Sequence, residues 1–93
     1  MTKAEVLGML KVDLGFTGSA YNERLEALID SAVSMMEREG VSSVDFDSTE
    51  DVQLVIMYTG WLWRKRYNYE PMPRMLRWAL NNRILGEKAR ADG

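Results

Sequence analysis

The sequence predicts an all-α fold: a small four-helix domain with a short N-terminal helix, two long helices and a C-terminal helix. Three observations favour this class. No segment has the alternation of apolar and polar residues that marks a strand. One segment repeats apolar residues on a helical period, and another is apolar on almost every side. A chain of 93 residues is long enough for one domain and no more.

The first helix is predicted to open at Thr2 and to end near Lys11 or Val12. Thr2 and Glu5 have the spacing of a capping box, in which hydroxyl and carboxylate satisfy free amides at the helix start. Its apolar side comprises Val6, Leu7, Met9 and Leu10. The two glycines within residues 13–19 then predict a loop.

The second helix has the clearest periodicity, with Ser19 predicted as its N-cap and Gly40 as the residue that ends it. Its core stripe is Leu25, Leu28, Ile29, Ala32, Val33 and Met36. The carboxylates that lie off this stripe are Glu23, Glu26, Asp30 and Glu37. This is the pattern of an amphipathic helix with one buried face.

Residues 41–48 are predicted to connect to the third helix, with Val44 and Phe46 held against the core and Ser48 or Thr49 as the N-cap. From Val52 to Trp63 the third helix is apolar almost all round, so it needs cover on every side. Three other short helices are expected not to cover it fully, which predicts self-association. A central core helix in a compact bundle is the compatible alternative.

The third helix is predicted to fade across Tyr67–Tyr69, because Pro71 and Pro73 follow, and Pro73 suits the first position of the fourth helix. One face of the fourth helix is Met75, Leu76, Ala79, Leu80 and Ile84. A second, mixed face is Arg74, Arg77, Trp78, Asn81 and Leu85. Residues 1–85 are thus predicted as the domain, and 86–93 as a flexible tail.

Composition argues against catalysis. The chain has no cysteine and no histidine, which removes disulfides, thiolate nucleophiles, nearly all zinc and haem chemistry and the usual general base. Neither a P-loop nor an EF-hand pattern is present. We expect no enzymatic activity, cofactor or metal. The sequence has no apolar run long enough to predict a membrane span, and its first residues lack the pattern of a signal peptide.

Charge is unevenly distributed: residues 1–60 carry a formal −7 and residues 61–93 a formal +5. An acidic part and a basic part can dock head-to-tail between copies, and such contacts close into rings when the rotation permits. The alternative is that two solvated faces simply differ in charge.

The stretch 61–69, WLWRKRYNY, concentrates aromatic and cationic side chains. Helical spacing splits the stretch, so part of it must face inward. The candidate interface residues are Trp61, Trp63, Arg64, Arg66, Tyr67, Arg74, Arg77, Trp78, Glu23, Glu26, Asp30 and Glu37. DNA binding by the basic 61–83 surface is the alternative, although a pI of about 5.1 is low for a DNA-binding domain. A small regulatory or scaffold module is a third possibility.

Two segments carry a family resemblance. Residues 13–41 (DLGFTGSAYNERLEALIDSAVSMMEREGV) and 51–85 (DVQLVIMYTGWLWRKRYNYEPMPRMLRWALNNRIL) resemble tailed-bacteriophage head–tail connector (adaptor) proteins. Met72–Arg77 combined with Leu80–Arg83 is the specific part. Asn22 departs from the pattern, which has an acid at that position.

The resemblance implies a non-enzymatic virion protein at the head–tail junction, present in the host cytoplasm during assembly. It implies a homo-oligomeric ring of about twelve copies below the portal protein. That ring would extend the DNA channel and receive a stopper or tail-completion protein, with DNA only passing through. The residues of the C-terminal tail would contribute to docking on the portal. Within the ring, the acidic second helix of one copy is expected to meet the basic third and fourth helices of the next.

Overall fold

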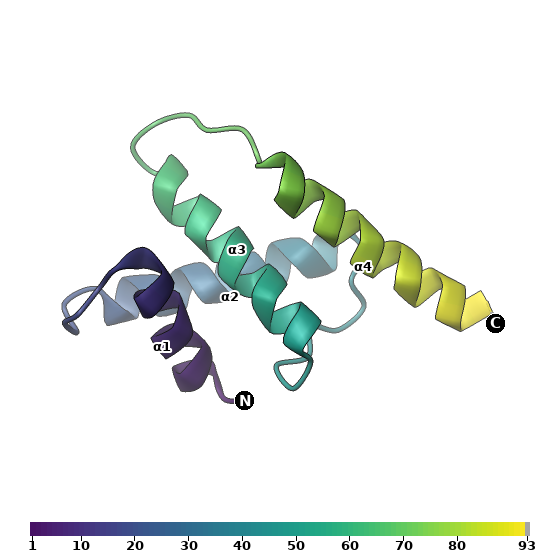
Figure 1. Cartoon of the computed structure of the whole chain (residues 1–93), viewed down its shortest axis with the longest axis horizontal. Coiled ribbons are helices and arrows are strands. Elements are labelled where there is room, and N and C mark those ends of the chain that lie inside the picture. Colours follow the sequence, from purple (N-terminus) through teal and green to yellow (C-terminus); the bar gives the residue numbers. More distant parts are fainter. Residues whose placement is uncertain (93) are drawn as a thin grey trace.

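The computed structural model describes residues 1–92, and all regular structure there is helical (Figure 1). The helices are α1 (Lys3–Leu14), α2 (Asn22–Glu39), α3 (Thr49–Lys65) and α4 (Arg74–Asp92). The prediction of an all-α, four-helix fold is therefore confirmed. Gly93, the last residue of the predicted tail, lies outside the described residues.

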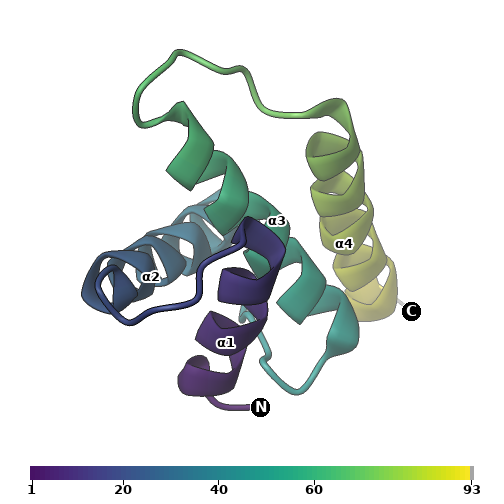
Figure 2. The same ribbon diagram turned by 60° about the vertical axis from the view of Figure 1, so that its left-hand side comes forward.

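α3 is the centre of the arrangement, because α1, α2 and α4 all pack against it. Seen as in Figure 2, α2 and α4 lie on opposite sides of α3, and α1 lies in front of it. The linker 66–73 arches away from the other elements before α4 begins (Figures 1 and 2). In Figure 1 the C-terminal end of α4 projects beyond them. The Cα atoms of the chain span 46 × 30 × 18 Å along its principal axes.

The single chain buries α3 on nearly all sides, contrary to the expectation that three short helices could not cover it. Between Asp51 and Leu62 only Gln53 is exposed, and Met57 is partly exposed. The crossing of α2 and α1 on one side and α4 on the other supplies the cover. The apolar character of α3 is thus explained by its central position and does not by itself indicate a partner.

The caps of α1 and α3 follow the sequence signals. The Glu5 amide donates to Thr2 Oγ1 at 3.2 Å and the Thr2 amide to Glu5 Oε1 at 2.9 Å, which confirms the capping box. Of the two candidate caps of α3, Ser48 is the one used, since its Oγ accepts from the Asp51 amide at 3.3 Å. Val44 and Phe46 pack against the core as predicted.

The loop between α1 and α2 is shorter than predicted at its start and longer at its end. α1 continues to Leu14, where Gly15 at φ 81° donates its N–H to carbonyls of the last turn. The prediction of Ser19 as N-cap is wrong, because α2 begins at Asn22 and Ser19 accepts only a turn bond from the Asn22 amide. Tyr21 precedes the helix without a side-chain cap.

Gly40 ends α2 as predicted, with φ at +135°, a conformation that favours glycine. A Cβ at this position would lie 3.2 Å from Cγ2 of Ile84. The bare backbone of Gly40 therefore also lets the end of α2 approach α4 closely.

The ends of the linker and the faces of α4 differ from the predictions in detail. α3 ends at Lys65, earlier than predicted, and α4 begins at Arg74, one residue after the predicted Pro73. Leu76 and Leu80 are buried in the core, but Met75, which was assigned to the same face, is exposed. Met75 lies in the first turn of α4, on the side of the helix turned away from Leu76 and Leu80.

Residues 86–92 continue α4 without a break, although Gly86 and the following polar residues predicted that the tail would fray. Glu87 in this stretch accepts hydrogen bonds from the Ser42 amide at 3.1 and 3.2 Å, one at each carboxylate oxygen. The helix is therefore tied to the connector 41–48 beyond the predicted domain end at residue 85. Mobility of the segment stays a prediction.

Candidate assembly interface

The stretch 61–69 begins in the core. Trp61 is 9% exposed, and its indole N–H donates to the Glu70 carbonyl oxygen at 2.9 Å. The Trp61 ring meets Tyr58 edge-on with centroids 5.6 Å apart, and the Lys65 ammonium lies 4.2 Å from the Trp61 centroid. Trp61 thus ties the linker back onto α3 and keeps little surface for a partner.

Trp63 belongs to an aromatic cluster that joins the end of α3 to the loop before α2. Its ring lies 5.2 Å from Phe16 and 5.6 Å from Tyr21, both in edge-to-face geometry. Arg66 lies over Trp63 at 3.3 Å and over Tyr67 at 4.2 Å, and it also donates to the Trp63 carbonyl oxygen. This packing holds the Tyr21 ring at the start of α2.

The rest of the stretch faces solvent. Tyr67 is 80% exposed and Tyr69 93% exposed. Arg64 and Lys65 are also exposed, with Arg64 Nε 3.6 Å from the Glu70 carboxylate. The linker and the last turn of α3 therefore present aromatic rings and cations together, a combination enriched at protein interfaces.

The outward face of α4 carries further exposed apolar side chains. Met75, Trp78 and Leu85 are large, exposed and on the side turned away from Leu76 and Leu80, and Trp78 is 62% exposed. We call Met75, Trp78 and Leu85, with Arg74 and Asn81 beside them, the outer α4 face. All five of these side chains are accessible.

The outer α4 face carries no carboxylate. Between Arg74 and Arg90 the only acidic residue is Glu87, which turns inward to bind Ser42 and Arg83. Lys88 and Arg90 are exposed further along the helix. The face is thus apolar and cationic, which suits an acidic partner with an apolar patch.

Arg77 has a partner within the chain, although it was predicted to meet another subunit. Its Nη1 lies 2.6 Å from Oε1 of Glu39, which also accepts at Oε2 from the Tyr58 hydroxyl at 3.3 Å. Burial, and then the nearby Glu39 charge, raise the pKa of Tyr58. Arg77 therefore helps hold α4 to the end of α2.

The predicted acidic residues of α2 lie on or near its outward side. Asp30 forms an ion pair with Lys3 at 3.1 Å, and Glu37 accepts from the Val44 amide at 3.3 Å. Glu23 is exposed and Glu26 half-buried. We call the outward side of α2, which exposes Glu23, Asp30, Ser31, Ser34 and Arg38, the outer α2 face.

A shallow depression of about 280 Å³ lies in the middle of the outer α2 face. It is lined by Asp30, Ser31, Ser34, Met35 and Arg38. Its lining carries both signs of charge, Asp30 and Arg38, and Asp30 is paired with Lys3.

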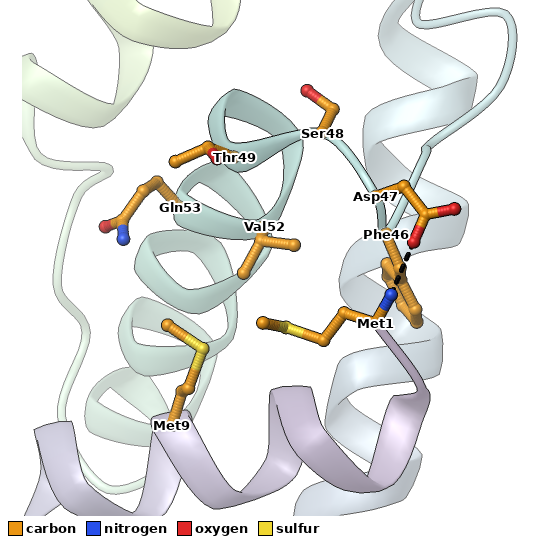
Figure 3. A pocket seen from close by; sticks show the side chains of 8 residues that line it. All are labelled: Met1, Met9, Phe46, Asp47, Ser48, Thr49, Val52 and Gln53. Atoms are coloured by element: carbon orange, nitrogen blue, oxygen red, sulfur yellow. Dashed lines mark hydrogen bonds and ion pairs between the residues drawn. The ribbon is translucent and has the colours of Figure 1, made fainter.

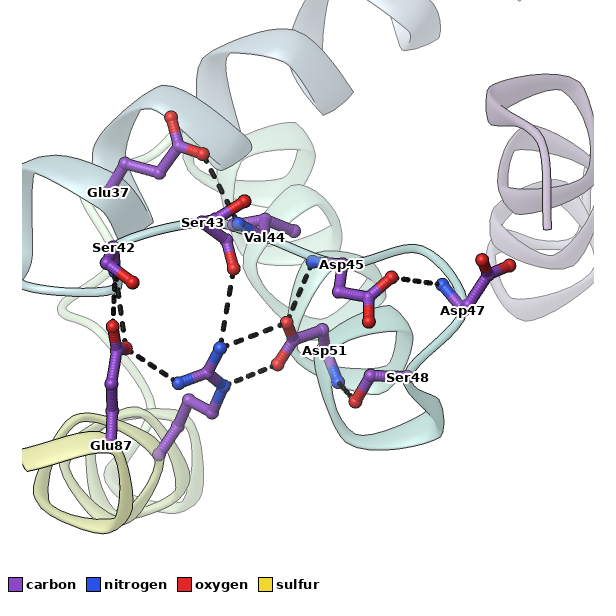
Figure 4. A network of polar contacts seen from close by, with 10 residues as sticks. Glu37, Ser42, Ser43, Val44, Asp45, Asp47, Ser48, Asp51 and Glu87 are labelled. Atoms are coloured by element: carbon purple, nitrogen blue, oxygen red, sulfur yellow. Dashed lines mark hydrogen bonds and ion pairs between the residues drawn. The ribbon is translucent and has the colours of Figure 1, made fainter. Parts of the chain in front are cut away.

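A buried ion-pair network, which was not predicted from the sequence, holds α4 in place (Figure 4). Arg83 was grouped with the surface cations, but it is buried, and its Nε lies 2.6 Å from Oδ1 of Asp51. Asp51, which is 0% exposed, also accepts from the Asp45 amide at 2.9 Å. On the other side Arg83 Nη1 lies 2.8 Å from Glu87.

These contacts link α4, the connector 41–48 and the start of α3. Hydrogen bonds that Arg83 donates to the Asp51 and Glu87 carboxylates raise its pKa, so its guanidinium stays charged. Hydrogen bonds from Ser42, with the Arg83 charge in addition, lower the pKa of Glu87. The burial of Arg83 could have been predicted from its spacing. Position 83 follows Leu76 and Leu80 at helical intervals, so it lies on the core face of α4.

A second concave surface lies between the N-terminal ends of the chain and of α3 (Figure 3). This pocket has a volume of about 420 Å³. Its walls are Met1, Met9, Phe46, Asp47, Ser48, Thr49, Val52 and Gln53. The Met1 amino group pairs with Asp47 at its edge. The pocket surface is mostly apolar, and its lining residues do not form a group of side chains arranged for catalysis.

Among residues 1–92 no group of three or more acidic side chains is arranged to hold a metal ion. In the same described part of the chain, no helix combines the length and apolarity needed to cross a membrane. Comparison with protein-family models, with curated proteins and with solved structures finds no match to this chain.

Proposed function

We propose that the chain is a non-enzymatic structural protein of a tailed-phage virion, a head–tail connector that forms a ring below the portal. In this role it extends the DNA channel and joins head to tail by receiving a stopper or tail-completion protein. The observation that carries the proposal is the exposed aromatic and apolar surface of the linker and the outer α4 face.

Large apolar groups gather on this surface at unusual density. Tyr67, Tyr69, Met75, Trp78 and Leu85 are all more exposed than buried within a span of nineteen residues. Large exposed apolar groups are candidates for an interaction surface, and Trp, Tyr and Arg are the residue types that anchor protein interfaces. Arg66 and Arg74 lie among these side chains and are exposed.

The resemblance to connector proteins supports the same reading. Leu76, Leu80 and Arg83 of its most specific motif are buried, so the motif fixes how α4 lies on α3. That position turns Trp78 outward. A motif that sets the position of α4 thereby also sets the surface through which the chain would assemble.

DNA binding by the same region is less well supported. Phosphate binding requires several free cations on one surface. Arg77 and Arg83 form ion pairs with carboxylates of the same chain, and Arg66 stacks on Trp63. The whole chain has a net charge of −2. Few cations of the 61–83 region remain to contact a duplex.

The test is to measure the mass of the chain by light scattering, alone over a concentration range and with its cognate portal ring. We expect the chain to bind the portal ring and add a ring of copies to it. A matched variant, Trp78→Ala, is expected to keep its helical content and lose assembly. Val12→Ala, which changes an exposed residue on α1, serves as the control.

Two results would overturn the proposal. One is a chain that stays monomeric at high concentration and never binds the portal ring. The other is tight binding of duplex DNA that weakens steeply when salt is raised, because counterion release gives that signature. The second result would favour a small DNA-binding protein.

A further inference from the structure

We infer that α4 is exchangeable between copies: it leaves α3 of its own chain and takes the same place on α3 of a second copy. The linker 66–73 is the hinge of this exchange. The exchanged surface is the inner side of α4, which carries Leu76, Leu80 and Arg83. The inference goes beyond the proposed function, because it concerns how copies of the chain hold one another and does not depend on a portal.

The contact that would be exchanged is complementary in the structure itself. Leu76 and Leu80 are buried in the core, where α4 packs on α3. The Arg83 guanidinium is buried in the same contact, with Nε 2.6 Å from Oδ1 of Asp51 at the start of α3. Each of these contacts joins α4 to the part of the chain before the linker. The same groups are therefore satisfied whether the two parts belong to one copy or to two.

The linker 66–73 has the features of an extended hinge. It arches away from the other elements (Figures 1 and 2). Pro71 and Pro73 each fix their own φ and hold the residue before them in an extended conformation. The side chains of Tyr67 and Tyr69 are exposed and add little that ties the linker to the helices. The linker therefore favours an open path over a tight return to its own α3.

The linker is also long enough to reach a second copy. Its eight residues, when extended, span about 26 Å at roughly 3.3 Å per residue. The shortest dimension of the chain is 18 Å between Cα atoms, so an extended linker carries α4 across the width of one copy. Opening releases the hydrogen bond of 2.9 Å from the Trp61 indole N–H to the Glu70 carbonyl oxygen. It also exposes the apolar groups under α4 to water, so an opened chain is stabilised by the α4 of a neighbour.

Concentration decides between the closed and the exchanged forms. Both forms contain the same contacts between α4 and α3, so they differ in the path of the linker and in the association of the copies. Any assembly that gathers copies together therefore favours exchange. A mutual exchange gives a dimer, whereas a one-way exchange from copy to copy is heterologous and closes into a ring when the rotation permits.

A mixing experiment with two matched variants tests the exchange. Asp51→Ala leaves Arg83 without its main partner in the closed chain, and Arg83→Met leaves Asp51 without its partner. When these two variants exchange α4, one contact regains the Asp51–Arg83 pair and the other loses both charges. Breaking a buried pair is strongly destabilising, so light scattering is expected to show at least about tenfold more complex in the mixture than in either variant alone.

The control mixes Asp51→Ala with the double variant Asp51→Ala/Arg83→Met. No combination of these chains contains the Asp51–Arg83 pair, so mixing them is expected to give no additional complex. This control also shows whether the variants associate merely because they are destabilised and expose apolar surface.

A second pair of variants keeps the test decisive if the buried substitutions prevent folding. Glu39→Arg and Arg77→Glu each place like charges together in the closed chain, where Arg77 Nη1 lies 2.6 Å from Glu39 Oε1. Both side chains are partly exposed, so the fold is expected to persist. Exchange of α4 between the two variants restores opposite charges at both contacts. The mixture is expected to give roughly threefold more complex than either variant alone, and less of it at high salt.

Mixtures that stay monomeric in both variant pairs would overturn the inference, as would an Asp51→Ala and Arg83→Met mixture that matches its control. These outcomes are separate from those of the proposed function. A chain that exchanges α4 but never binds a portal keeps the exchange and loses the head–tail role. A chain that adds to the portal ring without exchanging α4 keeps that role and refutes the exchange.

Discussion

At the scale of single residues, Asp51 is the side chain on which most of the polar structure depends. It is fully buried, caps the connector through the Asp45 amide and accepts two hydrogen bonds from Arg83. Buried charges are tolerated when they are paired and their hydrogen bonds are satisfied. The pair also ties α4 to the start of α3.

Replacing Asp51 by alanine is expected to lower the free energy of unfolding by about 3 kcal/mol, because Arg83 would keep a buried charge without its main partner. Asp51→Asn preserves the size and the acceptor oxygen and is expected to lose less, about 1–2 kcal/mol. Urea denaturation measures both. In the double variant Asp51→Ala/Arg83→Met the losses should not add, and additive losses would show that the two side chains act independently.

The lowered pKa of Glu87 predicts how the stability of the protein depends on pH. Its pKa lies below the ordinary value of 4.5 because Ser42 and Arg83 stabilise the carboxylate in the folded state. A lowered pKa contributes stability that is complete above the unfolded value and is lost as pH falls through the folded value. We expect the stability gap between the wild type and Glu87→Gln to be constant near neutral pH and to shrink below pH 4.5.

Thermal unfolding of both proteins between neutral and acidic pH gives this difference directly. Other carboxylates titrate equally in the two proteins, so their effects cancel in the comparison. A gap that does not change with pH would mean that Glu87 contributes nothing through its charge.

At the scale of the elements, helix starts depend on a few side-chain contacts. Ser48 caps α3 by accepting from the Asp51 amide, while neighbouring Thr49 is the first helical residue. Ser48→Ala is expected to lower stability by about 1 kcal/mol, and Thr49→Ala by much less. Equal effects of the two substitutions in chemical denaturation would contradict the assignment of the cap.

The sequence predicted helices well where local chemistry decides the structure. The capping box at Thr2, the end of α2 at Gly40 and the core stripe of α2 depend on residues close in sequence. The first two are confirmed, and four of the six stripe residues are buried, while Leu28 and Val33 are only partly buried. The start of α2 was mispredicted because Tyr21 is held by Phe16 and Trp63. Contacts with a residue on another helix cannot be read from a local capping signal.

The faces of α4 were only partly predictable. Leu76 and Leu80 fall on a period that predicts burial, and they are buried. Arg83 lies on the same period but was taken as a surface residue because of its charge. Its partner Asp51 is 32 residues away in sequence, so only the fold brings them together.

At the scale of the whole molecule, the uneven charge of the two parts is partly neutralised within the chain. Arg77 pairs with Glu39 and Arg83 with Asp51, so basic residues of α4 meet acidic residues of the first part. What remains exposed for a second copy is a smaller set that includes Arg74. The prediction of an interface residue at Arg74 stays a prediction, and Arg77 has a structural partner that competes with that role.

Charge reversal separates these two arginines. Arg74→Glu is expected to keep the melting temperature and to impair assembly on the portal by an order of magnitude or more. Arg77→Glu is expected to lower the melting temperature as well, because it would face Glu39 with a like charge. A loss of stability in Arg74→Glu would show that this side chain serves the fold.

The three tryptophans occupy three different surroundings, so tryptophan fluorescence can be used to follow assembly. Trp61 is enclosed, Trp63 lies under the Arg66 guanidinium, and Trp78 is in water. Of the three, Trp78 alone has an emission that solvent dominates, and covering it would shift that emission to shorter wavelength and shield it from iodide. Comparing the wild type with Trp78→Phe, which leaves Trp61 and Trp63 in place, would isolate this signal and follow subunit docking in real time, without any label.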